Sequence, residues 1–318
     1  MTALLLVGGL ALLLIGGEAL VRGSVAIAER YRLSPLLVGM VIAGFGTSMP
    51  ELVVSVRATV GGTPAIAAGN VIGSNISNIL LILAVAALIR PIGRPPRLFM
   101  PDGLILMAVT VAVVLLGLQG RIPGWQGGIM VVLLAGFIVF QYLRDRRANT
   151  ELLAVSGQPP VPLPAELPRR LSISILLILA GLGGLIAGGD WFVDGAVRLA
   201  RGLGVSEGLI GLTIVAVGTS LPELATSALA SIRGQSELAY GNVLGSNMFN
   251  LLGILGCAAI AGPLEVPRLM VYADGPVMIG ATALMLFFLA SGTRLVRWEG
   301  GAMLACYALY IALRAALS

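Results

Sequence analysis

The chain has 318 residues, of which 58% are hydrophobic and only 11% are charged. Soluble domains carry about 25% charged residues, so this composition excludes a soluble globular protein and indicates an integral membrane protein. The chain has a net charge of +5 and no histidine, which excludes histidine-based catalysis and histidine ligation of a metal.

Ten apolar segments are long enough to cross a bilayer, for which a helix needs about 20 residues. The predicted spans are 3–21, 35–58, 65–88, 101–119, 124–143, 171–190, 207–230, 238–261, 270–290 and 298–316. The second and seventh are interrupted by Pro50 and Pro222. The first is too long, and too continuous with the repeat, to be a cleaved signal peptide. We therefore expect an all-α membrane protein of about ten transmembrane helices.

The chain is an internal duplication. Residues 16–83 align with residues 188–255 without a gap, and about 30 of the aligned positions are identical. The predicted repeats are 1–143 and 171–318, with five spans each, and the segment 144–170 joins them. Because five is an odd number, the second repeat must enter the membrane from the opposite side. Inverted repeats of this kind are typical of secondary transporters.

The distribution of arginine predicts the orientation. All 20 basic residues are arginine, and 14 of them lie in the loops on the side of residues 144–170. The positive-inside rule makes that side cytoplasmic and places both termini outside, in a cell (inner) membrane. The segment 144–170 contains five prolines and mixed charge, which predicts a flexible or extended cytoplasmic linker. Nothing basic lies outside the loops, so a nucleic-acid partner is not expected.

Each repeat carries a carboxylate deep in an apolar span. Glu51 lies in GFGTSMPELVVS and Glu223 in AVGTSLPELATS. A charge at this depth costs about 2.5–3.5 kcal/mol on insertion scales and is usually retained for function. A single buried glutamate could simply pair with a buried arginine or bond to a neighbouring helix. Here no arginine is predicted at that depth and the feature occurs twice, so we favour a functional role.

The motif around each glutamate presents oxygen atoms on one side. Thr47 and Ser48 precede Glu51 by four and three residues, which places the three side chains on one helix face. Pro50 cannot donate a backbone hydrogen bond, and it crowds the carbonyl of Gly46. A kinked helix therefore offers a carboxylate, two hydroxyls and one or more free carbonyls. The second repeat has the same set at Gly218, Thr219, Ser220, Pro222 and Glu223.

A second block, GNxxGSNxxN, lies further along each repeat. Ser74 and Asn78 are four residues apart, as are Ser246 and Asn250, so each pair adds a hydroxyl and an amide oxygen to one helix face. The glycines of these blocks permit close helix approach; they are Gly69, Gly73, Gly241 and Gly245.

These donors are hard oxygen atoms. Ca²⁺ accepts six to eight such ligands in flexible geometry, whereas Mg²⁺ requires a stricter octahedron and retains water. Transition metals prefer cysteine or histidine. Cys257 and Cys306 lie in apolar spans, where we interpret them as packing residues. No ATP-binding loop is visible, and no nucleophile–base pair suggests an enzyme.

Other polar residues in the spans favour structural roles. Glu18 and Asp190 lie near span ends, where interfacial or interhelical bonding is the expected role. Asp102 and Asp274 precede apolar spans, and we interpret them as helix caps. Asn75 and Asn247 could be ligands or could bond between helices, and the sequence leaves both interpretations open.

The two paired blocks resemble the α-repeats of the sodium/calcium exchangers, within the calcium:cation antiporter superfamily. The resemblance covers both repeats and the number of spans. It implies four central cation sites at which Ca²⁺ and Na⁺ compete under alternating access, with the first and sixth spans sliding against the rest. The implied ligands are Glu51, Glu223, Asn78, Asn250, Thr47, Thr219, Ser48, Ser220, Ser74 and Ser246, with the carbonyls of Gly44 and Ala216.

This chain departs from the family pattern at Asn250, where many members have aspartate. The site therefore holds two formal negative charges, which bears on the number of sodium ions and disfavours dependence on potassium. We expect an antiporter that exchanges Ca²⁺ for Na⁺ and normally expels Ca²⁺, acting as a monomer without a cofactor. The alternatives are an H⁺/Ca²⁺ antiporter, whose branch typically has Gly-Asn in place of Gly46-Thr47, and a cation channel.

Overall fold

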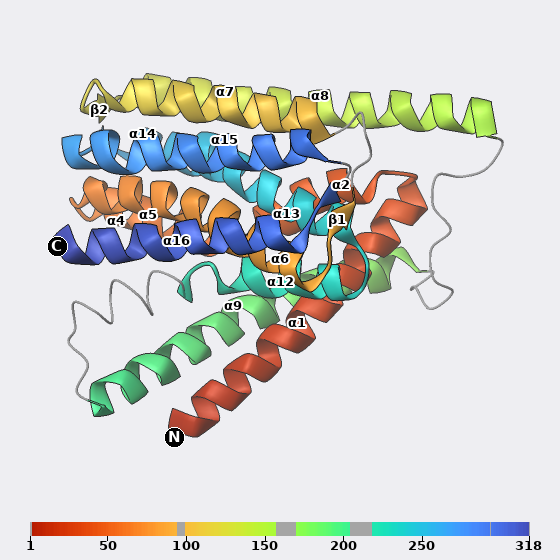
Figure 1. Ribbon diagram of the computed structural model, residues 1–318, viewed down its shortest axis with the longest axis horizontal. Helices are drawn as coiled ribbons and strands as arrows, with labels where there is room; N and C mark the ends of the chain where they lie inside the picture. Colours follow the sequence, from red (N-terminus) through yellow and green to blue (C-terminus); the bar gives the residue numbers. More distant parts are fainter. Residues whose placement is uncertain (1, 94–98, 157–169, 204–217, 293, 318) are drawn as a thin grey trace.

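The computed structural model describes residues 2–93, 99–156, 170–203, 218–292 and 294–317. This part of the chain is helical apart from short loops and two-residue strands (Figure 1). Seven of its helices are long and apolar enough to span a membrane, or eight if one bent pair counts as a single span. The ten-span architecture is consistent with this count. Helix α16 is a further long helix, which corresponds to the tenth span. The seventh predicted span begins at residues outside the described part, so it cannot enter the count.

The first repeat has helices at all five predicted spans, although the first helix continues to Tyr31, beyond the predicted end at residue 21. Its elements are α1 (Thr2–Tyr31), α2 (Pro35–Val38), η1 (Gly39–Gly44), α3 (Phe45–Thr47), α4 (Met49–Val60), α5 (Pro64–Ser77), η2 (Asn78–Leu83), α6 (Ala84–Ile89), β1 (Ile92–Gly93), α7 (Phe99–Gly117), β2 (Arg121–Ile122) and α8 (Gly124–Ser156). The segments η1 and η2 are π-helical turns, which occur frequently at functional sites.

The second repeat has the equivalent elements. They are α9 (Leu171–Gly202), α12 (Leu221–Ile232), α13 (Ser236–Met248), η4 (Phe249–Ile254), α14 (Leu255–Ala261), β3 (Leu264–Glu265), η5 (Met270–Asp274), α15 (Gly275–Ser291), β4 (Arg294–Leu295) and α16 (Arg297–Leu317). The π-helical turn η4 lies in the same place in its repeat as η2 does in the first.

The predicted flexible or extended conformation of the linker is wrong in its first part. Helix α8 continues to Ser156, so residues 144–156 are helical rather than extended. The physical reason is local, because RDRRANTELLAVS contains good helix formers and the first proline comes only at Pro159. The remainder of the predicted linker, 157–169, lies outside the described residues.

Two small strand pairs establish that the repeats are inverted. Strand β1 pairs antiparallel with β4, and β2 pairs antiparallel with β3. Each pair joins a loop of the first repeat to the non-equivalent loop of the second. The loop between spans three and four can reach the loop between spans nine and ten only if the repeats enter the membrane from opposite sides. Strands β1 and β2 accordingly lie towards opposite ends of the helix bundle in Figure 1.

The third and eighth spans form the centre of the bundle. In their most apolar windows, 72% of the residues of Pro64–Ile89 and 89% of those of Ser236–Ala261 are buried, against 22–44% for the other single-helix spans. The functional blocks GSNISN and GSNMFN therefore lie in the protein core rather than at the lipid surface.

Helices α1 and α9 cross the other helices and pack against each other (Figure 1). Their contact is a seam of glycines at heptad spacing, at which an added Cβ would lie 2.6–3.0 Å from a backbone atom of the facing helix. Small residues of this kind allow helices in lipid to approach backbone to backbone. The seam consists of Gly9, Gly16 and Gly23 on α1 and Gly181, Gly188 and Gly195 on α9.

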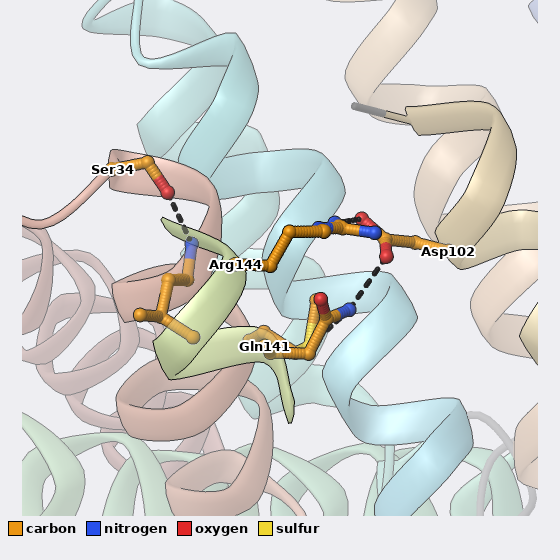
Figure 2. Close-up of polar contacts among 6 residues, drawn as sticks. Ser34, Asp102, Gln141 and Arg144 are labelled. Carbon is orange, nitrogen blue, oxygen red and sulfur yellow. Dashed lines mark hydrogen bonds and ion pairs between the residues drawn. The ribbon is translucent and has the colours of Figure 1, made fainter. Parts of the chain in front are cut away.

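The start of the broken second span, at Ser34 and α2, is held by α8. The Nε2 atom of Gln141 and the guanidinium of Arg144 each donate to the fully buried carboxylate of Asp102 at 2.6 Å (Figure 2). The next residue, Asp145, accepts a hydrogen bond from the backbone N–H of Ser34 at 3.0 Å. Ser34 itself caps α2, because its hydroxyl accepts from Leu37 N at 3.1 Å. This end of the broken helix is therefore fixed to the fifth span.

The interpretation of Asp102 and Asp274 as helix caps is wrong. Asp102 lies inside α7 and forms an ion pair with Arg144. Asp274 makes no capping bond at the start of α15; instead it accepts from Tyr310 OH at 3.0 Å and pairs with Arg314 at 3.3 Å. In each repeat a buried aspartate thus ties the fourth span to the fifth, because the partners come from a helix that is distant in sequence.

Candidate functional site

The site forms where the two broken helices face each other across the pseudo-symmetry axis. Helix α3 ends at Thr47, Ser48 has φ −85° and ψ 9°, and α4 begins at Met49 with Pro50 in its first turn. The helices on either side of this break are bent by 44°. In the second repeat Ser220 has φ −91° and ψ 8°, and α12 begins with Leu221 and Pro222. Proline removes the backbone donor and so stabilises the break in both copies.

Nearly all the predicted ligands in the described part of the chain are buried. Glu51 is 1% exposed and Glu223 is 2% exposed. Among the predicted ligands that the structure describes, only Thr219 is half-buried. Ala216 lies outside the described residues. The other buried predicted ligands are Thr47, Ser48, Ser74, Asn78, Ser220, Ser246, Asn250 and Gly44.

Hydrogen bonds between the repeats bring these groups together. Ser48 Oγ donates to Glu223 Oε1 at 2.8 Å. Ser246 Oγ donates to the backbone carbonyl of Gly44 at 3.0 Å. Both bonds join predicted ligands from opposite repeats, so the residues singled out in two distant segments converge on one place.

Close helix contact makes this convergence geometrically feasible. A Cβ added at Gly245 would overlap the carbonyl of Met40, and one added at Gly241 would overlap the carbonyl of Leu36. These glycines allow α13 to lie directly on α2 and η1, which brings Ser246 within reach of Gly44. The predicted role of Gly241 and Gly245 in close approach is confirmed.

Several oxygen atoms of the site have no hydrogen-bond partner among the described residues. They are buried acceptors: Glu51 Oε2, Glu223 Oε2 and Asn250 Oδ1. Buried polar atoms are nearly always satisfied in native proteins, so unsatisfied ones require a physical explanation. A cation that accepts oxygen ligands would supply it here.

Thr47 and Thr219, which are equivalent by sequence, differ in their surroundings. The hydroxyl of Thr47 is buried, and its closest acceptor is the carbonyl of Ala43 at 2.9 Å. Thr219 lines a cavity of about 430 Å³ together with Pro50, Asp190 and Asp194. One half of the site therefore faces protein, and the other half faces a cavity.

The two asparagines whose role the sequence leaves open bond within their own helices. Asn75 Nδ2 donates to Val71 O at 2.8 Å and Asn247 Nδ2 donates to Val243 O at 2.7 Å. Their Oδ1 atoms are buried without a partner among the described residues. The described hydrogen bonds of these two amide nitrogens therefore lie within a helix and not between helices. Glu18, by contrast, makes the expected interhelical bond, to Arg233 at 2.6 Å.

Three further residues touch the site without having been predicted from the sequence. Ser77 Oγ lies 3.3 Å from Ser220 Oγ, and Asn70 and Asn242 bond to the backbone of the two glutamates. Asn70, Ser74 and Asn78 are spaced four apart, as are Asn242, Ser246 and Asn250. This spacing is the signal that could have identified the two asparagines.

The donor set suits a hard cation. The side chains offer carboxylate, hydroxyl and amide oxygens, and no group of three or more His, Cys, Asp or Glu side chains that could hold a metal is found in the described ranges. Such a site holds two formal negative charges, which balance one divalent or two monovalent ions. This chemistry fits Ca²⁺ and Na⁺ better than a transition metal.

Comparison with known proteins decides the family. The family described as "Sodium/calcium exchanger protein" matches residues 1–143 and 173–316. The chain belongs to the sodium/calcium exchanger family. The match covers both repeats and leaves out the whole segment 144–170 between them.

Relatives within the exchanger family span nearly the full chain. A putative antiporter, CaxA, of Alkalimonas amylolytica is 35% identical over 306 residues, with 94% of each chain covered. The sodium/calcium exchanger MaX1 of Methanosarcina acetivorans is 28% identical, with 97% of each chain covered. The solved structure of the sodium-calcium exchanger NCX_Mj soaked with Na⁺ and Ca²⁺ is 30% identical, with a TM-score of 0.81 and 98% of this chain and 97% of that chain covered.

Proposed function

We propose that this protein is a secondary active antiporter that exchanges Ca²⁺ for Na⁺ across a membrane by alternating access, and that it normally expels Ca²⁺. The observation that carries the proposal is the pair of buried glutamates, one from each inverted repeat, each with one carboxylate oxygen that has no hydrogen-bond partner among the described residues. Membership of the exchanger family and similarity to MaX1 and NCX_Mj support the choice of ions.

The ions would be held by both repeats together. The carboxylates of Glu51 and Glu223 supply the negative charge, and neutral oxygens complete the coordination. The neutral ligands in this proposal are Thr47, Thr219, Ser48, Ser220, Ser74, Ser246, Asn78 and Asn250, with the carbonyls of Gly44 and Ala216.

Alternating access is a consequence of the inverted architecture. In such transporters the repeats enclose a fixed site near the midplane, and one bundle rocks or slides against the other. The glycine seam joins α1 and α9 backbone to backbone, so this pair moves as a unit across the broken helices. A transporter of this kind carries out no covalent chemistry and needs no cofactor.

The protein is proposed to lie in the cell (inner) membrane as a monomer, with both termini outside and residues 144–170 in the cytoplasm. The excess of arginine on one side supports this orientation. A relative 35% identical over 283 residues is the inner membrane protein YrbG of Escherichia coli, which supports the location. Cysteine labelling of intact cells tests the orientation, and a linker that is labelled from outside would overturn it.

Transport measurements with purified protein in proteoliposomes test the function. We expect uptake of radioactive Ca²⁺ when an outward Na⁺ gradient is imposed, and none when a pH gradient replaces it. Uptake driven by the pH gradient alone would show an H⁺/Ca²⁺ antiporter. Flux without any ion on the opposite side would show a channel.

A further inference from the structure

An asparagine in each repeat lies beside the cation site without belonging to its ligand set. The side chain of Asn242 donates through Nδ2 to the backbone carbonyl of Glu223 at 3.2 Å and to Ser227 Oγ at 2.8 Å. In the first repeat Asn70 Nδ2 donates to the backbone carbonyl of Glu51 at 3.3 Å and to a serine hydroxyl at 3.0 Å. The same pair of hydrogen bonds thus occurs in both repeats, between equivalent atoms.

In each repeat, the asparagine side chain contacts two groups of the helix that carries the glutamate: the glutamate carbonyl and a serine hydroxyl. Ser227 comes four residues after Glu223, as Ser55 does after Glu51, so carbonyl and hydroxyl lie on one face one turn apart. An amide –NH₂ group has two protons and can donate to both acceptors at once. Two contacts one turn apart restrain the rotation of a helix about its axis, which a single contact does not. The asparagine therefore fixes the direction in which the adjacent glutamate leaves α4 or α12.

The same asparagine also fixes the neighbouring helix. Asn242, Ser246 and Asn250 lie four residues apart on α13 and its continuation, so the contact at Asn242 sets the rotation of the face that carries the two proposed ligands. The distance from ligand to glutamate is thereby set within each repeat. Ser227 and Asn242 are both fully buried, so water does not compete for these bonds.

Rigid support is needed here because the helix is broken immediately before each glutamate. The break at Ser48 or Ser220 removes the continuous backbone ladder that would otherwise orient α4 or α12. We propose that Asn70 and Asn242 are positioning residues of the transport site: they hold Glu51 and Glu223 in the orientation that binds the cation. This inference rests on the proposed function, since it assigns the asparagines a role at that site.

The bonds predict an effect on ion affinity rather than on turnover. Loss of a buried hydrogen bond is worth about a factor of ten in an equilibrium constant. We expect Asn242→Leu to raise the Ca²⁺ concentration for half-maximal exchange about tenfold or more, with a smaller fall in maximal rate. Ser227→Ala removes one of the two contacts and should raise the half-maximal Ca²⁺ concentration less. In the double variant Ser227→Ala should have no additional effect, because Asn242, the hydrogen-bond partner of Ser227, is already replaced.

Ser231→Ala is the matched control. Ser231 lies one turn further along α12, is fully buried, and its hydroxyl has no partner among the described residues. We expect no change in Ca²⁺ affinity for this variant. Ca²⁺-induced thermal stabilisation of each purified protein measures binding independently of transport.

The outcomes separate the positioning role from a structural one. If Asn242→Leu and Ser227→Ala lower the melting temperature but leave the half-maximal Ca²⁺ concentration and the Ca²⁺-induced stabilisation unchanged, the asparagine is structural and the proposal is wrong. Equal effects of Ser227→Ala and Ser231→Ala would also overturn it. If wild-type protein neither binds nor exchanges Ca²⁺, the proposed function fails, which the wild-type measurement alone reveals.

Discussion

Two carboxylates in a buried, oxygen-lined site determine how much positive charge that site can hold. Glu51 and Glu223 come from opposite repeats, and each retains one oxygen atom without a partner among the described residues. A divalent ion compensates both charges at once, so the carboxylates are not redundant. The pseudo-symmetry of the fold places them together, whereas neither repeat alone contains the pair.

We expect Glu51→Gln and Glu223→Gln each to abolish Ca²⁺ transport. Removing one partner of a buried charge pair costs about 3–5 kcal/mol, which lowers affinity for the ion by more than a hundredfold. The measurement is Na⁺-driven Ca²⁺ uptake at matched protein levels. Wild-type uptake by either variant would remove that glutamate from the site.

Asn250 sets the net charge of the same site. It is buried, and both polar atoms of its side chain lack partners among the described residues. Two glutamates balance one Ca²⁺ or two Na⁺, and a third Na⁺ would leave a positive charge in a medium of low dielectric constant, which Coulomb energy opposes. We expect exchange near two Na⁺ per Ca²⁺ with little net current, and Asn250→Asp should raise Na⁺ affinity or stoichiometry.

The reversal potential of exchange in proteoliposomes at several Na⁺ ratios measures this stoichiometry. A clear ratio of three to one in the wild type would show that the amide and hydroxyl dipoles replace the missing charge. The electrostatic argument would then be wrong, while membership of the exchanger family would stand.

At the scale of helices, glycine decides which elements approach closely enough to share a site. We expect Gly245→Ala to destabilise the protein by about 1–3 kcal/mol and to abolish transport, because the added Cβ overlaps the backbone of Met40 and separates Ser246 from Gly44. Thermal unfolding and Ca²⁺ uptake measure the two effects. Gly136→Ala on α8 is the control, since no described atom lies within 4 Å of its added Cβ. Equal behaviour of the two variants would contradict the close-contact argument.

The helices illustrate what the sequence could and could not predict. Hydrophobic runs locate the spans because bilayer thickness sets their length, and the two prolines locate the breaks because their effect is local. The predicted roles of Asp102 and Asp274 are wrong because their partners, Arg144 and Arg314, lie on other helices and only tertiary packing brings them together. The contacts of Asn70 and Asn242 depend on tertiary packing in the same way, although their spacing from Ser74 and Ser246 is visible in the sequence.

At the scale of the whole molecule, access to the site is asymmetric. The 430 Å³ cavity beside α9 is lined by Asp190, Asp194, Val193 and Thr219. The equivalent positions in the first repeat are closed: Val21 is 2% exposed, and Thr47 is fully buried. Because the repeats are inverted, the cavity beside α9 and the closed positions beside α1 belong to opposite sides of the site. With the orientation proposed above, we expect this cavity to be the access to the site from outside.

An ion-pair cluster lies on the opposite side of the site. Glu18, the counterpart of Asp190, bonds to Arg22 on its own helix and to Arg233 at the end of α12, each at 2.6 Å. This cluster ties α1 to the end of α12, on the side that we propose faces the cytoplasm, whereas Asp190 and Asp194 line the cavity on the other side. Since exposed ion pairs contribute about 0.2–1 kcal/mol, we expect the cluster to bias the equilibrium between the two conformations of an alternating-access transporter without locking it.

We therefore expect Arg233→Ala to shift the population towards the inward-facing state by up to about fivefold. The readout is the labelling rate of a single cysteine in a background in which Cys257 and Cys306 are replaced by alanine. A cysteine at Val21 should be labelled faster in the Arg233→Ala protein, and one at Val193 should be labelled more slowly, because the two positions are equivalent on opposite sides of the site. Arg57→Ala, at an exposed position on α4, is the control and should change neither rate.

If both cysteines keep their wild-type rates in Arg233→Ala, the cluster does not bias the conformational equilibrium. If both rates rise together, the substitution loosens the fold rather than shifting access from one side to the other.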